Sequence, residues 1–167
     1  MRNQIARVSL FALIVCSIIW LGAVNVRAVI GNELLNFGTL QFKANLDAEL
    51  EREVFRLISL SSVIVIGGYL GAFVSAILFV KTTPLSFKQN GWLMMSAILF
   101  FIFSPVEFYT LFLDWRMVAL DFFSSPSLTD FRILFIHRLG ALAGVPMIAL
   151  LSYYTIIGLV VWQPMKR

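Results

Sequence analysis

A small set of polar residues, gathered where predicted helices reach one side of a membrane, carries most of the chemistry this chain could perform. Glu107, His137 and Arg138 lie inside or beside stretches that are otherwise almost free of charge. Ionisable side chains are costly in such stretches, so they normally face a protein interior and find partners. A carboxylate and an imidazole that titrate could bind a proton or a small ligand. The full predicted cluster consists of Asn25, Arg27, Arg56, Glu107, Asp114, His137 and Arg138.

The elements that must position these residues are marked by gaps in the charge. Asp, Glu, Lys, Arg and His are all absent from residues 8–26, 57–80, 89–106 and 139–165. Each gap approaches or exceeds the roughly 18 apolar residues that a helix needs to cross a bilayer. The chain is 60% apolar and only 13% charged, which leaves no material for a separate soluble domain. We therefore predict an all-α, integral membrane four-helix bundle, a single domain over residues 1–167 with spans at about 8–29, 55–80, 90–113 and 130–162.

The charges at the borders of these gaps predict the orientation. Three segments are basic and contain no acid: the start of the chain, the connection between spans two and three, and the end of the chain. The other two connections, by contrast, hold most of the acids. Basic residues favour the cytoplasmic side, so we predict a cell-membrane protein with both termini in the cytoplasm. The net charge of +4 then reflects topology, and no nucleic-acid partner is expected.

A cleaved secretory signal is a competing interpretation of the first span. Val26, Arg27 and Ala28 follow an apolar run and offer small residues at a cleavage position. The run is nearly twice as long as an ordinary signal core, which favours a retained helix. Cleavage would leave three spans with the same orientation.

Helix starts are indicated by capping residues. Asn45 or Asp47 can begin the second helix, which would run unbroken to about Lys81. Ser127 and Asp130 resemble a capping box, so the fourth helix should begin near residue 128. The long outer segment before the second helix is either an amphipathic linker or a flap over the outer mouth of the bundle, through Leu34, Leu35, Phe37, Leu40 and Phe42.

Glycine spacing predicts where helices approach closely. Gly67 and Gly71 form one GxxxG motif in the second span, and Gly140 and Gly144 form another in the fourth. Small residues let helix backbones meet in lipid, where burial from water no longer drives association. Contacts within the bundle are the favoured interpretation. Self-association through these faces, or binding of other membrane subunits, remains open, beside contact with membrane lipids.

Helical periodicity predicts which way the polar residues point. His137 shares a face with Gly140 and Gly144, so it should look inward. In the third span Ser104, Glu107, Leu111 and Asp114 recur at intervals of three and four, which puts both carboxylates on one stripe. We expect Glu107 to pair with Arg138 or His137.

The sequence lacks the residues that several classes of reaction require. Cys16 is the single cysteine, which excludes an intrachain disulfide and CxxC chemistry, and one histidine cannot supply a bis-His haem site. The sequence has neither a Gly-x-Ser-x-Gly nor an HExxH motif. We predict no catalytic residue, metal or cofactor. A membrane enzyme acting on lipid remains the least favoured alternative.

Three short segments resemble a known group of membrane proteins. Trp20-Leu21-Gly22-Ala23, Pro105, and the stretch from Phe131 to His137 that enters the fourth span are similar to the four-helix membrane family of unknown function related to copper-resistance-D-type proteins. The resemblance implies four spans and a histidine at the entry to the last helix. No copper role is carried over, because the chain lacks additional His- or Met-rich outer motifs.

Two functions from different classes fit these observations. The first is a small, non-enzymatic accessory or structural subunit of a membrane assembly, in which the polar cluster is a set of buried ion pairs that tie helix ends together. The alternative is a small transporter or ligand-binding membrane protein with an outward-facing pocket around Glu107, His137 and Arg138. The first predicts paired polar groups, and the second predicts a pocket that reaches Glu107.

Overall fold

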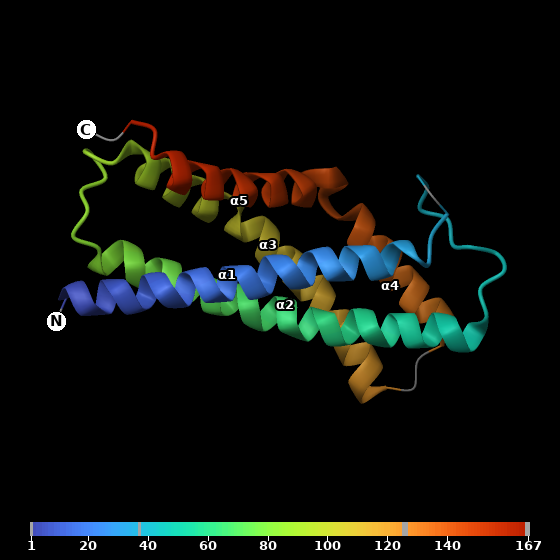
Figure 1. The fold of residues 1–167 in the computed structure, drawn as a ribbon. Helices are drawn as coiled ribbons and strands as arrows, with labels where there is room; N and C mark the ends of the chain where they lie inside the picture. The colour runs from blue at the N-terminus through green and yellow to red at the C-terminus, as the bar shows by residue number, and fades with distance from the viewer. Residues whose placement is uncertain (1, 37, 125–126, 166–167) are drawn as a thin grey trace.

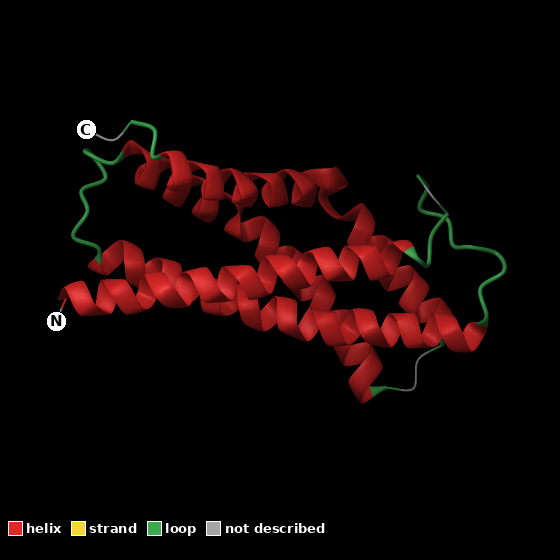
Figure 2. Cartoon of the chain, viewed as in Figure 1, coloured by secondary structure: helices red, strands yellow, loops and turns green. Residues whose placement is uncertain are grey.

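The chain folds into helices, as the charge gaps predict. The computed structural model describes residues 2–36, 38–124 and 127–165, and over these residues no strand is present beyond one isolated bridge between Leu35 and Phe42. Four helical segments are long and apolar enough to cross a membrane. The elements are α1 (Arg2–Asn32), α2 (Ala48–Thr82), α3 (Gly91–Phe123), α4 (Leu128–Gly140), the 3-10 turn η1 (Ala141–Gly144) and α5 (Val145–Trp162) (Figures 1 and 2).

The helices begin and end where local chemistry favours it. Asp47 occupies the N-cap position of α2, although its side chain makes no capping hydrogen bond. α2 ends at Thr82, and its C-cap residue Thr83 directly precedes Pro84, which cannot continue a helix. At α4 the predicted capping box is confirmed, because the Asp130 amide donates to the Ser127 hydroxyl at 3.3 Å and the Ser127 amide donates to the Asp130 carboxylate at 3.1 Å.

The helices give the molecule two distinct ends. At one end, which we call the terminal end, α1 begins and α5 finishes, so both chain termini lie there (Figure 1). At the other, the capped end, the 33–47 linker and α4 meet the end of α1 and the start of α2. α1 and α2 form the most extensive helix pair, and α3 runs obliquely behind them to contact α2, α4 and α5.

Close approach of α1 and α2 depends on Gly68 and Gly71. A methyl group at Gly68 would meet the Trp20 backbone nitrogen and Cβ at 3.0 Å, and one at Gly71 would meet the Cys16 Sγ at 2.8 Å. At Gly67 a methyl group would meet nothing within 4 Å. The prediction for Gly71 is thus confirmed and that for Gly67 is wrong. The contact uses Gly68 in place of Gly67 beside Gly71, so the centre of the contact face is rotated by about 50° around the helix axis.

The fourth apolar segment is broken, which corrects the prediction of one helix over 130–162. Leu142 and Ala143 have φ of 53° and 48°, and Gly144 has φ of 90°. Pro146 explains the break, because its ring would clash with the carbonyl of residue 142 in a continuous helix and it has no N–H to donate. Gly140 and Gly144 are exposed, and a methyl group on either meets nothing within 4 Å. They therefore mark the break rather than a helix contact.

Two clusters of apolar side chains fill the interior. The middle of the bundle is centred on Trp20, whose ring contacts Tyr69 and Tyr153 edge to face at 4.8 Å in both cases. At the capped end Leu34 is fully buried against α2 and α4 residues that include Phe55 and Phe131. The linker is therefore a flap over the end of the bundle. Leu40 remains exposed, and Phe37 lies outside the described residues.

We predict that Gly68→Leu destabilises the protein by about 1 to 3 kcal/mol, because the added side chain must push α1 away from α2. Gly67→Leu is the matched control, since it adds the same side chain one position away at an open site. Reversible unfolding in mixed detergent micelles measures both variants. Equal destabilisation by the two substitutions would contradict the observed α1 and α2 contact.

Candidate functional site

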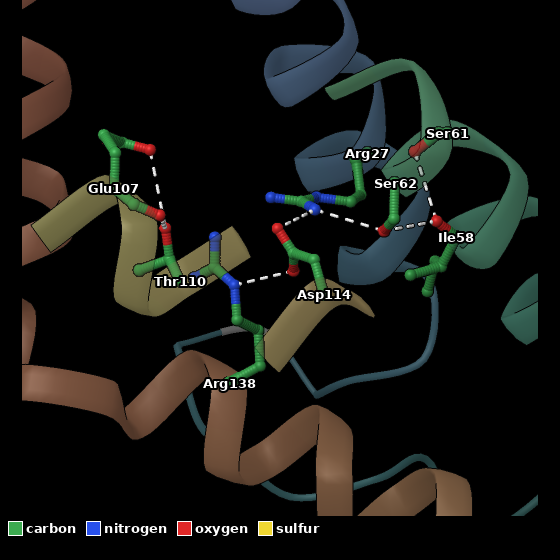
Figure 3. Close-up of polar contacts among 8 residues, drawn as sticks. All are labelled: Arg27, Ile58, Ser61, Ser62, Glu107, Thr110, Asp114 and Arg138. Carbon is green, nitrogen blue, oxygen red and sulfur yellow. Dashed lines mark hydrogen bonds and ion pairs between the residues drawn. The ribbon is translucent and has the colours of Figure 1, made fainter. Parts of the chain in front are cut away.

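The polar cluster is centred on Asp114 of α3, which is buried with 1% of its surface exposed. Its two carboxylate oxygens face two different arginines (Figure 3). Oδ2 lies 2.6 Å from Nη1 of Arg27, and Oδ1 accepts a hydrogen bond from Nε of Arg138 at 2.8 Å. One carboxylate thus joins α1, α3 and α4 through two short ion pairs. We call Arg27, Asp114 and Arg138 the triad.

The second helix enters this network through Ser62. Nη1 of Arg27 donates to the Ser62 hydroxyl oxygen at 3.2 Å, and that hydroxyl donates to the backbone carbonyl of Ile58 at 2.8 Å (Figure 3). Ser62 is itself buried. Four helices are therefore joined by one network of ion pairs and hydrogen bonds.

The sequence positions Asp114 by helical spacing. Ser104, Glu107, Leu111 and Asp114 are all buried on α3, so the predicted stripe is confirmed. Two turns separate Glu107 from Asp114, and this separation decides which of them the arginines reach.

Glu107 is buried but lies outside the triad. Its carboxylate accepts a long hydrogen bond of 3.4 Å from the Thr110 hydroxyl, whose shorter bond of 2.9 Å goes to the Glu107 backbone carbonyl. Among the described residues no ion pair reaches Glu107, so the predicted pairing with Arg138 or His137 is wrong. That prediction assumed a straight fourth helix. The break at η1 instead lets α4 lie against α3 where Arg138 meets Asp114.

The remaining predicted site residues are dispersed. His137 is exposed rather than inward-facing, because the face of α4 that it shares with Gly140 packs against no other helix. Arg56 is also exposed and makes only a 3.8 Å pair with Glu53 on its own helix. The side-chain amide of Asn25 donates to the Tyr154 hydroxyl at 2.5 Å, which links α1 to α5.

Two further ion pairs at the capped end were not predicted. Arg132 of α4 binds Glu51 of α2 with two hydrogen bonds of 2.6 Å, and Arg52 binds Asp121 at 3.3 Å. Glu51 is 1% exposed. A signal existed, because Glu51 precedes Phe55 by four residues on the buried face of α2. The arginines also lie over aromatic rings, Arg132 over Phe42 and Arg52 over Phe131.

The arrangement is suited to joining helices more than to reaction chemistry. Within the described ranges, no three His, Cys, Asp or Glu side chains lie close enough to hold a metal ion. Asp114 faces a guanidinium with each oxygen, so neither oxygen is free to act as a base. Two surface hollows occur elsewhere, one along α5 and one between the start of α1 and the end of α2.

Comparison of the chain with protein-family models, with curated proteins and with solved structures finds no match. The class is therefore defined by the fold and the cluster: an all-α protein with four helical segments able to cross a membrane, joined at one end by buried ion pairs. The resemblance to the family related to copper-resistance-D-type proteins stays a prediction.

We predict that Asp114→Asn lowers the free energy of unfolding by about 3 to 5 kcal/mol, because it leaves two largely buried guanidinium groups without their carboxylate. Glu53→Gln is the control, since it removes a carboxylate from an exposed pair and should cost less than about 1 kcal/mol. Unfolding in mixed detergent micelles compares the two.

A double-mutant cycle tests whether the triad acts as a unit. Adding Arg138→Gln to Asp114→Asn should cost less than Arg138→Gln costs alone, since the second substitution removes an unpaired buried cation. Strict additivity of the two effects would contradict the ion pair.

Proposed function

We propose that this chain is a multi-pass protein of the cell membrane with both termini in the cytoplasm, serving as a non-enzymatic accessory or structural subunit of a membrane assembly. The observation that carries the proposal is the triad, because its largely buried charges hold three helices together.

The surface of the helices supports a membrane location. Large apolar side chains are exposed on the outer faces of the helices, such as Phe11 at 70% on α1 and Val161 at 68% on α5. In water such faces would be unfavourable, whereas in lipid they are solvated by acyl chains. Every acid of the chain except Glu107 and Asp114 lies in or beside the connections of the capped end, which supports placing that end outside.

Helix lengths suggest where the bilayer boundary falls. Arg7 and Arg27 are 20 positions apart on α1, about 30 Å along the axis, which equals the hydrocarbon thickness of a typical bilayer. The 18 residues of α5 span about 27 Å. With Arg7 at the inner boundary, the triad lies at the outer boundary. The linker and α4 then form a cap outside the hydrocarbon.

Such a cap suits a subunit that presents a fixed surface to a partner. Each of the three buried acids at the capped end, Glu51, Asp114 and Asp121, is paired with an arginine from another helix. Paired charges of this kind specify geometry without leaving a group free for proton transfer or nucleophilic attack. We therefore assign the binding of a partner subunit to the rigid outer face that the four helices carry.

One observation favours the second candidate, a small transporter or ligand-binding protein with a site around Glu107, His137 and Arg138. Glu107 is only 8% exposed and carries no ion pair within the described residues. A buried carboxylate without a cation is costly, and functional sites are where such a cost is commonly kept. Proton binding at Glu107 is the chemistry that this candidate requires.

Cysteine labelling tests the membrane location and orientation. In a Cys16→Ser background, Leu40→Cys in the linker should react with a membrane-impermeant maleimide in intact cells, because it is exposed at the capped end. Leu85→Cys, exposed at the terminal end, should react only after the membrane is permeabilised. The reverse pattern would contradict the orientation, and labelling of both in intact cells would contradict the four spans.

Glu107→Gln separates the two candidate functions. The substitution keeps the shape of the side chain and removes its charge, so an accessory subunit should keep its fold and its co-purifying partner in mild detergent. Proteoliposomes that contain the wild-type protein and those that contain the variant should show the same proton flux. If the wild-type protein conducts protons and Glu107→Gln does not, with unchanged thermal stability, the chain is a transporter and the accessory function is wrong.

A further inference from the structure

A hollow at the terminal end of the molecule combines an apolar floor with a cationic rim. It lies between the first turns of α1 and the last turns of α2, and the connection that follows α2 closes one side. Leu10, Phe79 and Leu85 supply apolar surface, whereas Asn3, Arg7 and Thr83 supply polar groups. The hollow is thus lined by both apolar and polar side chains.

The positive charge of this hollow comes from Arg7. Arg7 is exposed, and in the part of the chain that the structure describes no carboxylate pairs with it. The first acid after it is Glu33, 26 positions away and so about 39 Å along α1. On α2, whose last turns line the hollow, the closest acid is Glu53, 26 positions before Phe79. The third helix carries no acid before Glu107.

Helix dipoles do not alter this balance. The positive end of α1 and the negative end of α2 lie together, because the two helices are antiparallel neighbours, and their partial charges oppose each other. Arg7 is the charged side chain that lines the hollow. Thr83 is buried at the rim, where its hydroxyl oxygen already accepts from the Leu85 amide at 3.3 Å and leaves the hydroxyl proton to donate.

We propose that this hollow binds one acidic phospholipid of the cytoplasmic leaflet, with the phosphate at Arg7 and the upper part of an acyl chain against Leu10, Phe79 and Leu85. The assignment rests on the membrane location and orientation proposed above, which put the terminal end at the inner boundary. A volume of about 220 Å³ is below the roughly 300 Å³ of small-molecule pockets, so the hollow takes a headgroup and chain segment rather than a whole ligand.

Charge and shape together favour a lipid over a soluble anion. A free phosphate would need several convergent donors and would gain nothing from the apolar floor. An acidic lipid uses both features of the hollow, because its phosphodiester faces Arg7 while its chain covers apolar surface that is otherwise exposed. The same two features discriminate against zwitterionic lipid, whose own cation would lie beside Arg7.

Binding can be measured on the full chain in a neutral detergent. Dioleoylphosphatidylglycerol and dioleoylphosphatidylcholine are titrated separately, and bound lipids are counted by native mass spectrometry. The wild-type protein should prefer phosphatidylglycerol at one site. Arg7→Gln should weaken phosphatidylglycerol binding about fivefold, as expected for one basic residue near a lipid phosphate, and leave phosphatidylcholine binding unchanged.

Two further variants test whether the effect of Arg7→Gln is specific to this hollow. Arg116→Gln removes an exposed arginine toward the capped end and should bind phosphatidylglycerol as the wild type does. Leu10→Trp keeps the charge but fills the hollow, so it should weaken binding of both lipids. Excess inorganic phosphate should not displace phosphatidylglycerol.

Three outcomes would overturn the site. These are equal affinity for the two lipids, equal loss of binding in Arg7→Gln and Arg116→Gln, and displacement of phosphatidylglycerol by phosphate. Both ends of the protein are accessible in a micelle, so this experiment does not depend on orientation. The cysteine labelling described above tests orientation separately.

Discussion

The pairing of Asp114 with two arginines is the constraint on which the rest of the structure depends. A buried carboxylate between two guanidinium groups is favourable only while all three side chains stay in place, because removing any partner leaves a charge in a poorly solvating environment. Arg27 comes from α1, Asp114 from α3 and Arg138 from α4. The relative positions of these helices are therefore set by one contact, which is costly to break and tolerates little change in distance or angle. The apolar clusters on either side of it are less exacting, since apolar side chains can repack.

On either side of this contact the molecule has two regions, which are packed in different ways. Toward the terminal end, α1 and α2 meet through Gly68 and Gly71, and aromatic rings around Trp20 join α2 and α5. Toward the capped end, the linker and α4 add charged pairs to an apolar interior. The first region is built for close backbone contact, as helices in lipid require, and the second resembles the interior of a small soluble domain.

Sequence reasoning succeeded where a property is local. The charge gaps marked the four helical segments, the Ser127 and Asp130 pair marked the start of α4, and spacing put Glu107 and Asp114 on one buried stripe. Each of these depends on residues within a few turns of one another.

It failed where the outcome depends on long-range position. Pro146 alone predicts a kink in the fourth span, whereas the left-handed conformations of Leu142 and Ala143 make a full break, so His137 was oriented on a helical face that does not continue. Arg138 could reach either carboxylate of the stripe by length alone. Its choice of Asp114 over Glu107 follows from the placement of α4, which no short pattern encodes. The error at Gly67 was smaller. Gly71 does contact α1, but its partner in that contact is Gly68, one position further along the helix than Gly67.

The break between α4 and α5 has a consequence for the kind of bilayer that suits the protein. α1, α2 and α3 are each longer than 30 residues and can adjust to a thicker or thinner membrane by tilting. α5 has no such reserve, since η1 stops it at one end and Gln163, with φ of 43°, stops it at the other. Its fixed length of about 27 Å matches thin bilayers best. Hydrophobic mismatch at this one helix would then sort the protein among membranes of different thickness.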